Sequence, residues 1–141
     1  MAVEIPHNAL VALCDGGKAV LLRNIGTETR IALEAERHVA FKDVTNDGPS
    51  GAQVRDHTRR QVDEATFAKQ IVRLLDELHE KGAFSALVLA ADPHTLGQMR
   101  NAMHKRLEQA IILTLTKELT NTPPHEVARI LQEMSAPEPM V

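Results

Sequence analysis

The longest apolar run of the chain, Phe84–Ala91 (FSALVLAA), leads directly into signals that begin a helix. Almost no polar residue interrupts this run, which is typical of a central strand covered on both faces. Asp92 then occupies the position of a helix N-cap, and Pro93 that of the first helical residue. The pattern predicts a buried strand followed by a helix whose apolar stripe is Leu96, Met99, Met103 and Leu107.

The first third of the chain is predicted to be an antiparallel meander of three strands. Two apolar runs, Ala9–Cys14 and Lys18–Ile25, are separated by Asp15-Gly16-Gly17, a tight-turn signal because glycine tolerates positive φ. From Arg30 to Phe41 the odd positions are apolar apart from Arg37, which indicates a long strand with one face in solvent.

The middle segment, Asp43–Gln61, has no sustained periodicity and contains glycine and proline, so we expect a long flexible loop at 43–61. A helix is expected from near Asp63 to Gly82, with an apolar face formed by Phe67, Ile71, Leu74, Leu75 and Leu78. A further strand follows at Ala110–Leu115. A last helix begins at Thr122-Pro123-Pro124, and residues 135–141 form a frayed tail.

The predicted order of strands and helices is βββαβαβα, which defines the fold class. Three antiparallel strands followed by alternating strands and helices imply an α/β fold with a mixed sheet and right-handed crossovers. This order is that of a ribonuclease-H-like sheet, in which the fourth strand lies parallel beside the first and helices pack on the sheet. At 141 residues, we expect one domain over 1–141.

Composition removes several classes of function. A net charge of −3 argues against a generally basic, nucleic-acid-binding surface, although it permits a local basic patch. A single cysteine excludes an internal disulfide and, with no signal-peptide pattern or membrane-length apolar run, indicates a cytoplasmic protein. The histidines lack zinc-ligand spacing, so neither a metal nor a cofactor is expected.

Several stretches resemble the bacterial host attachment protein family, described as required for attachment to host cells. The matching pieces, which extend over nearly the whole chain, are Asp15–Ala19, Phe67-Ala68, Gly82–Phe84, Leu87–Pro93, Leu96–Arg100 and Lys117–Asn121. That family is similar to the middle domain of archaeo-eukaryotic peptide-chain release factors, itself ribonuclease-H-like. The resemblance implies the fold more directly than it implies an activity.

In release factors the corresponding loop carries Gly-Gly-Gln, whose glutamine positions the attacking water. Here the loop reads Gly51-Ala52-Gln53, and the alanine restricts the backbone at the middle position. Gly51, Gln53 and the arginines Arg55, Arg59 and Arg60 are therefore candidates for an RNA contact, against the alternative of a solvated loop.

Ribonuclease-H-type nucleases hold metal ions between carboxylates, which gives an enzymatic alternative. Asp15 and Asp92 would end adjacent parallel strands, and Glu64 would lie at the start of a helix. A turn residue at Asp15 and N-caps at Asp63 and Asp92 explain the same pattern without metal.

The second helix carries Arg100, His104, Lys105 and Arg106 on its outer side. Arg100 and His104 are spaced i, i+4 and would share a face that could contact phosphate, unless it is simply a solvated surface. A nucleophilic pair of Cys14 with His94 is conceivable, but a buried apolar role is the usual one for such a cysteine.

These observations favour a non-catalytic binding module for RNA, the ribosome or a protein partner. The alternative is a metal-dependent nuclease or hydrolase that uses Asp15 and Asp92. A third hypothesis is a protein–protein module, for instance a homodimer that pairs through the edge strand of the meander.

Overall fold

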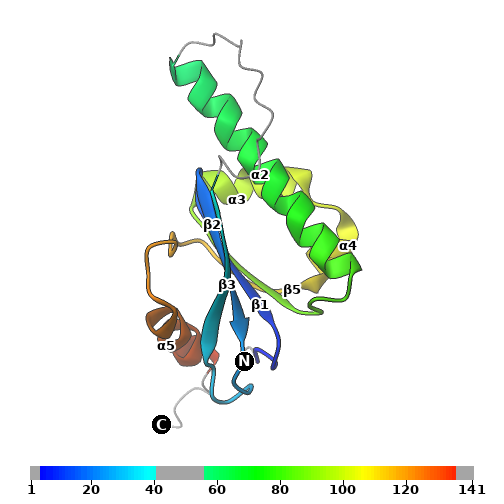
Figure 1. Cartoon of the computed structure of the whole chain (residues 1–141), viewed down its shortest axis with the longest axis vertical. Coiled ribbons are helices and arrows are strands. Elements are labelled where there is room, and N and C mark those ends of the chain that lie inside the picture. The colour runs from blue at the N-terminus through cyan, green and yellow to red at the C-terminus, as the bar shows by residue number, and fades with distance from the viewer. Residues whose placement is uncertain (1–3, 41–55, 136–141) are drawn as a thin grey trace, which may run out of the picture.

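The computed structural model of the chain describes residues 4–40 and 56–135, which form one sheet with helices packed against it (Figure 1). The elements in chain order are β1 (Leu10–Cys14), β2 (Lys18–Asn24), β3 (Leu33–Ala40), α2 (Asp56–Glu80), β4 (Leu87–Ala91), α3 (Pro93–Ala102), α4 (Lys105–Ala110), β5 (Ile111–Leu115) and α5 (Pro124–Ser135).

The five-stranded sheet has the order β3-β2-β1-β4-β5. β1 pairs antiparallel with β2 and parallel with β4, β2 is antiparallel to β3, and β5 is parallel to β4. The predicted ribonuclease-H-like mixed sheet, with the fourth strand parallel beside the first, is therefore confirmed.

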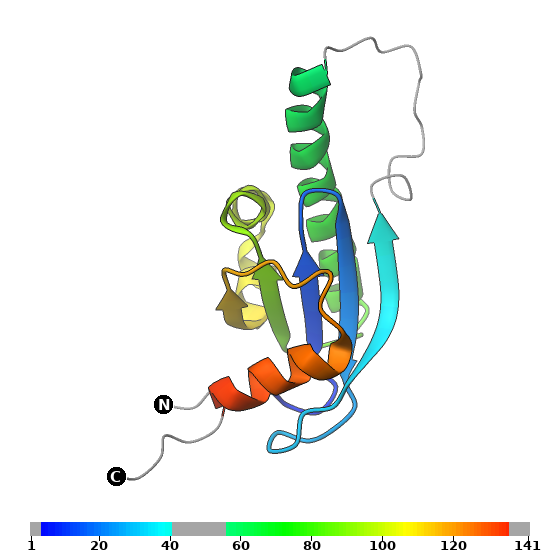
Figure 2. The same cartoon turned by 90° about the vertical axis from the view of Figure 1, so that its left-hand side faces the viewer.

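Each face of the sheet carries its own apolar core. The side chains of α2, α3 and α4 pack on the face that includes Leu10, Leu21 and Leu89. Those of α5 pack on the opposite face, over Val11 and Leu22. Figure 2 shows this arrangement from the side, with α5 crossing the sheet on the face away from α2. Because β1 and β4 are buried on both faces, they read as continuous apolar runs.

The first helix begins earlier than the sequence predicted. α2 starts at Asp56 and not near Asp63, so residues 56–61, which we had expected to be part of the loop, are helical. This stretch contains no glycine or proline but also no apolar stripe, and the stripe was the signal used to locate the helix. The remainder of the expected loop, residues 43–55, lies outside the described residues.

The expected second helix is two helices. α3 ends where Met103 adopts extended angles (φ −79°, ψ 140°), and α4 follows after His104, so the order of elements is βββαβααβα. Met99 and Leu107 are nevertheless both fully buried, because the break reorients the chain between them before it enters β5.

The edge strand β3 begins at Leu33, not at Arg30, and contains an irregularity that the alternation of residues did not reveal. Ala35 pairs with Leu22 and Arg37 with Leu21, which leaves Glu36 as an extra residue in a β-bulge. Residues on the two sides of the bulge therefore exchange faces. Leu33 therefore packs in the core beneath α5, whereas Val39, which is also at an odd position, packs in the core beneath α2.

Candidate functional site

The two carboxylates at the ends of β1 and β4 are both engaged in structural hydrogen bonds. Asp15 Oδ1 accepts from the backbone N–H groups of Gly17 and Lys18, each at 2.8 Å. Its Oδ2 accepts from the hydroxyl of Thr120 at 2.8 Å. Asp15 therefore shapes the β1–β2 turn and ties it to the segment after β5.

Asp92 is the N-cap of α3, where its Oδ2 accepts from the backbone N–H of Thr95 at 3.1 Å. Over the part of the chain that the structure describes, no three His, Cys, Asp or Glu side chains are grouped so that they could hold a metal ion. The side chain of Glu64 is not among those described. The observed hydrogen bonds give Asp15 a role in the turn and Asp92 a role as helix cap, the two structural roles that their sequence positions suggested.

Cys14 lies at the end of β1, immediately before Asp15, and is buried. Burial, together with the negative charges of Asp15 and Asp92, raises the pKa of its thiol from 9.0 to about 12. A thiol that keeps its proton at neutral pH is a poor nucleophile, so the burial of Cys14 argues against a nucleophilic pair with His94.

Residues of two family-like pieces, Asp15–Ala19 and Lys117–Asn121, meet at this edge of the sheet. Besides the bond from Thr120 to Asp15, the Lys18 ammonium donates to the side-chain oxygen of Asn121. The two pieces therefore form a joint between segments that are distant in sequence.

A cleft with a different character lies between α2 and the break that separates α3 from α4. This hollow, which we call the α2 cleft, has a volume of about 360 Å³ and is lined by Lys69, Val72, Arg73, Asp76, Ala102 and His104. The four polar side chains make no hydrogen bond or ion pair with any other residue that the structure describes. The charges in the cleft are therefore available to a ligand.

A second hollow, of about 370 Å³, lies on the other flank of α2 and is lined by Arg37, His38, Val39, Gln70, Arg73, Leu74 and Glu77. We call it the β3 hollow. Arg73 lines both hollows. Basic side chains thus extend from β3 across α2 to the N-cap of α4, with the carboxylates of Asp76 and Glu77 beside them.

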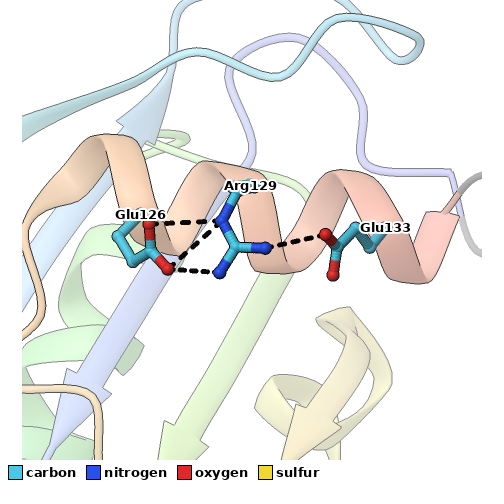
Figure 3. Close-up of polar contacts among 3 residues, drawn as sticks. All are labelled: Glu126, Arg129 and Glu133. Carbon is cyan, nitrogen blue, oxygen red and sulfur yellow. Dashed lines mark hydrogen bonds and ion pairs between the residues drawn. The ribbon is translucent and has the colours of Figure 1, made fainter.

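The exposed face of α5 offers a contrast, because its arginine is neutralised within the helix. Arg129 lies between Glu126 and Glu133, and its guanidinium pairs with both carboxylates, with Glu133 at 2.7 Å (Figure 3). The hydrogen bond from Arg129 lowers the pKa of the Glu126 carboxyl. A hollow of about 460 Å³ beside α5 is lined partly by this arginine, but its charge is already balanced.

The predicted phosphate-contacting face of the second helix is only partly present. Arg100 is exposed in the last turn of α3, His104 is the N-cap of α4, and Lys105 is the first residue of α4. The prediction that Arg100 and His104 share one helix face is wrong, because the helix breaks between them. His104 instead lines the α2 cleft.

The residues that sequence reasoning missed are Lys69 and Arg73 of α2 and Arg37 of β3. Lys69, Arg73 and Asp76 follow one another at helical spacing beside the apolar stripe, a signal that was present but unused. Gly51, Gln53 and Arg55 lie outside the described residues. Arg59 and Arg60 belong to the first turns of α2 and not to a loop.

Strand order, strand directions and the placement of the helices define a ribonuclease-H-like α/β domain. The chain belongs to the bacterial archaeo-eukaryotic release factor family 12, whose model matches residues 8–131. No curated protein matches the sequence.

The solved structures that are similar to this chain include two at low sequence identity. The archaeal translation termination factor aRF1 has 13% identity and a TM-score of 0.48 over 90% of this chain, which spans 36% of that factor's chain. RuvC of Thermus thermophilus has 13% identity and a TM-score of 0.37, with 92% of this chain and 83% of the RuvC chain covered.

No helix among the described residues is both long enough and apolar enough to span a membrane.

Proposed function

We propose that the chain is a non-catalytic module that binds RNA, either free or within the ribosome, through the cationic flanks of α2. The observation that carries the proposal is the group of basic side chains in the two hollows that share Arg73, of which Lys69 and Arg73 form no hydrogen bond or ion pair with another residue that the structure describes. Membership of a release-factor family supports a role in translation.

The chemistry of these side chains suits phosphate groups. A guanidinium donates two parallel hydrogen bonds to phosphate oxygens, and an ammonium adds a compact positive charge. Such contacts do not require a basic protein, because charges on other faces are screened beyond about 10 Å at moderate salt. The net charge of −3 is therefore compatible with a local site.

The test is the binding of a labelled single-stranded RNA at low salt, together with co-sedimentation with ribosomes. The double variant Lys69→Gln with Arg73→Gln is expected to weaken RNA binding by about an order of magnitude. Arg30→Gln is the matched control, because Arg30 is exposed in the hairpin between β2 and β3. Binding of the control should equal that of the wild type.

The two assays also distinguish a non-ribosomal RNA target from RNA within the ribosome. Binding to free RNA without co-sedimentation indicates a non-ribosomal target, and co-sedimentation that the double variant loses indicates the ribosome. Absence of both interactions would overturn the proposal and would leave a protein partner as the remaining class.

The segment Gly51–Arg55 is included in the proposal as a second RNA contact, within one domain that spans the chain. Such a module would act in the cytoplasm. An effect on attachment to host cells, as the resemblance to host attachment proteins suggests, would then follow indirectly from altered protein synthesis.

A further inference from the structure

The α2 cleft contains more than a phosphate site needs. Val72 and Ala102 give it an apolar side, and Val72 is buried. Asp76 adds a half-buried carboxylate with no hydrogen-bond or ion-pair partner among the residues that the structure describes. A carboxylate repels phosphate, so its presence beside two cations points to a ligand that also offers hydrogen-bond donors.

The charged groups of the cleft that could contact a phosphate and a hydrogen-bond donor follow one another along α2. Lys69 and Arg73 are one turn apart, and Asp76 follows three residues after Arg73. Lys69 and Asp76 are thus separated by two turns, or about 10 Å along the helix axis. Arg73 lies between Lys69 and Asp76 along the helix, so both a cation and the carboxylate acceptor are within reach of one bound group near Arg73.

Asp76 and Arg73 could form an i, i+3 ion pair, yet the structure contains none between them. The volume of about 360 Å³ lies within the range of small-ligand sites, roughly 300–1,000 Å³. An apolar side, a carboxylate acceptor and two cations match the three parts of a nucleotide, namely base, base edge and phosphate.

We infer that the α2 cleft holds one nucleotide of single-stranded RNA, and that the nucleotide is a guanosine. In this arrangement the base lies against Val72 and Ala102, and Lys69 and Arg73 contact its phosphate. Asp76 accepts hydrogen bonds from N1–H and N2–H of the guanine. Guanine is selected because it presents these two donors side by side on its Watson–Crick edge, which a carboxylate can accept together.

This inference rests on the proposed RNA-binding function and adds a base preference to it. The test compares the affinities of oligouridylates that carry a single central G, A, C or U. The wild type is expected to bind the G-containing oligomer about tenfold more tightly than the others. Asp76→Asn should remove this preference and leave the affinity for oligouridylate unchanged or slightly higher.

Glu77→Gln is the matched control, because it removes the same charge at the next position, on the flank that faces the β3 hollow. This variant should keep the preference for guanine. In contrast, Lys69→Gln should weaken binding of all four oligomers by a similar factor, since it removes a phosphate contact. Unchanged thermal unfolding, followed by circular dichroism, would show that the variants are folded.

The possible failures are distinguishable. RNA binding without a preference for guanine, or equal effects of Asp76→Asn and Glu77→Gln, would overturn the guanosine pocket and leave the proposed function intact. No binding of any oligomer would overturn the guanosine pocket, and the additional absence of co-sedimentation with ribosomes would overturn the proposed function as well.

Discussion

At the scale of single residues, Asp15 links the β1–β2 turn to a threonine 105 positions later in the chain. Both carboxylate oxygens take part, since Oδ1 accepts from two backbone N–H groups and Oδ2 from the Thr120 hydroxyl. Removal of this side chain leaves three donors without their acceptor.

Asp15→Ala is therefore expected to lower the free energy of unfolding by about 2–3 kcal/mol. Asp15→Asn should cost less, because the amide retains one acceptor oxygen and can donate to the Thr120 oxygen. Since the chain has no Trp and no Tyr, the measurement is urea unfolding followed by far-ultraviolet circular dichroism. Equal stability of Asp15→Ala and the wild type would contradict this account of Asp15.

Cys14 predicts a dependence of stability on alkaline pH. The unfolded thiol loses its proton near its ordinary pKa of 9.0, whereas the native thiol keeps it up to about 12. Across this interval the unfolded state binds fewer protons, so the free energy of unfolding falls as pH rises, by up to about 1.4 kcal/mol per pH unit. Below pH 9 the contribution of this group is fully present.

Between about pH 8 and pH 10 the wild type should lose about 1.4 kcal/mol more than Cys14→Ala, as measured by urea unfolding at both pH values. Identical pH profiles of the two proteins would show that the thiol does not titrate as burial dictates.

Local residue roles were partly predictable from sequence. The N-cap role of Asp92 and the turn role of Asp15 follow from their immediate neighbours, and the structure confirms both. The bond from Thr120 to Asp15 was not predictable, because it depends on where the segment after β5 lies relative to β1.

At the scale of elements, the exposed edge of β3 is modified at two places. Glu36 forms the bulge, and its carboxylate pairs with Arg23 at 2.9 Å. Nearer the hairpin, the side-chain amide of Gln132 donates to the carbonyl of Thr29 at 2.7 Å and accepts from the N–H of Ile31 at 2.8 Å. Bulges and covered edges hinder the addition of another strand, so they argue against the homodimer hypothesis.

Deletion of Glu36 tests this interpretation. Because Ala35 and Arg37 already pair with adjacent residues of β2, the deletion restores regular pairing without moving any other β3 residue to the wrong face. We expect a folded protein whose regular edge self-associates more than the wild type, measured by light scattering.

Deletion of Val20 from the regular part of β2 is the control, because it shifts the register and should prevent folding. A Glu36 deletion variant that is fully folded and as monomeric as the wild type would remove the protective role assigned to the bulge.

The boundaries of elements were the least predictable part of the fold. The stripe Leu96, Met99, Met103 and Leu107 reads as one helix, yet the chain breaks at Met103. No glycine or proline marks this break. The break is needed because α4 leads directly into β5. This requirement comes from the tertiary structure, so no local sequence pattern predicts it.

At the scale of the whole molecule, the strand order could be predicted from the order of elements alone, because crossover rules leave few arrangements of a meander followed by strand–helix units. The cationic flanks of α2 could not be predicted from the order of elements. Their members come from β3, α2 and the break between α3 and α4, and only the packing of these elements brings them together.

This distribution of charge predicts the salt dependence of RNA binding. If Arg37, Lys69 and Arg73 each contact a phosphate, log K should fall with log salt concentration with a slope of about −2 for a single strand. Arg73→Gln should reduce the slope by about 0.7, as measured by titrations at several KCl concentrations. Arg129→Gln should leave it unchanged, since Glu126 and Glu133 neutralise that arginine.

The long-range ties of the sheet also have a consequence for synthesis of the protein. β1 pairs with β4, and α5 is bound to the β2–β3 hairpin by Gln132 across 103 positions of sequence from Thr29. Contacts of such high sequence separation slow folding, because loop closure precedes the stabilising interactions. A nascent chain that has not yet extended to Leu131 would carry a meander with one apolar face uncovered. Binding of chaperones to this intermediate should therefore persist until α5 has left the ribosome.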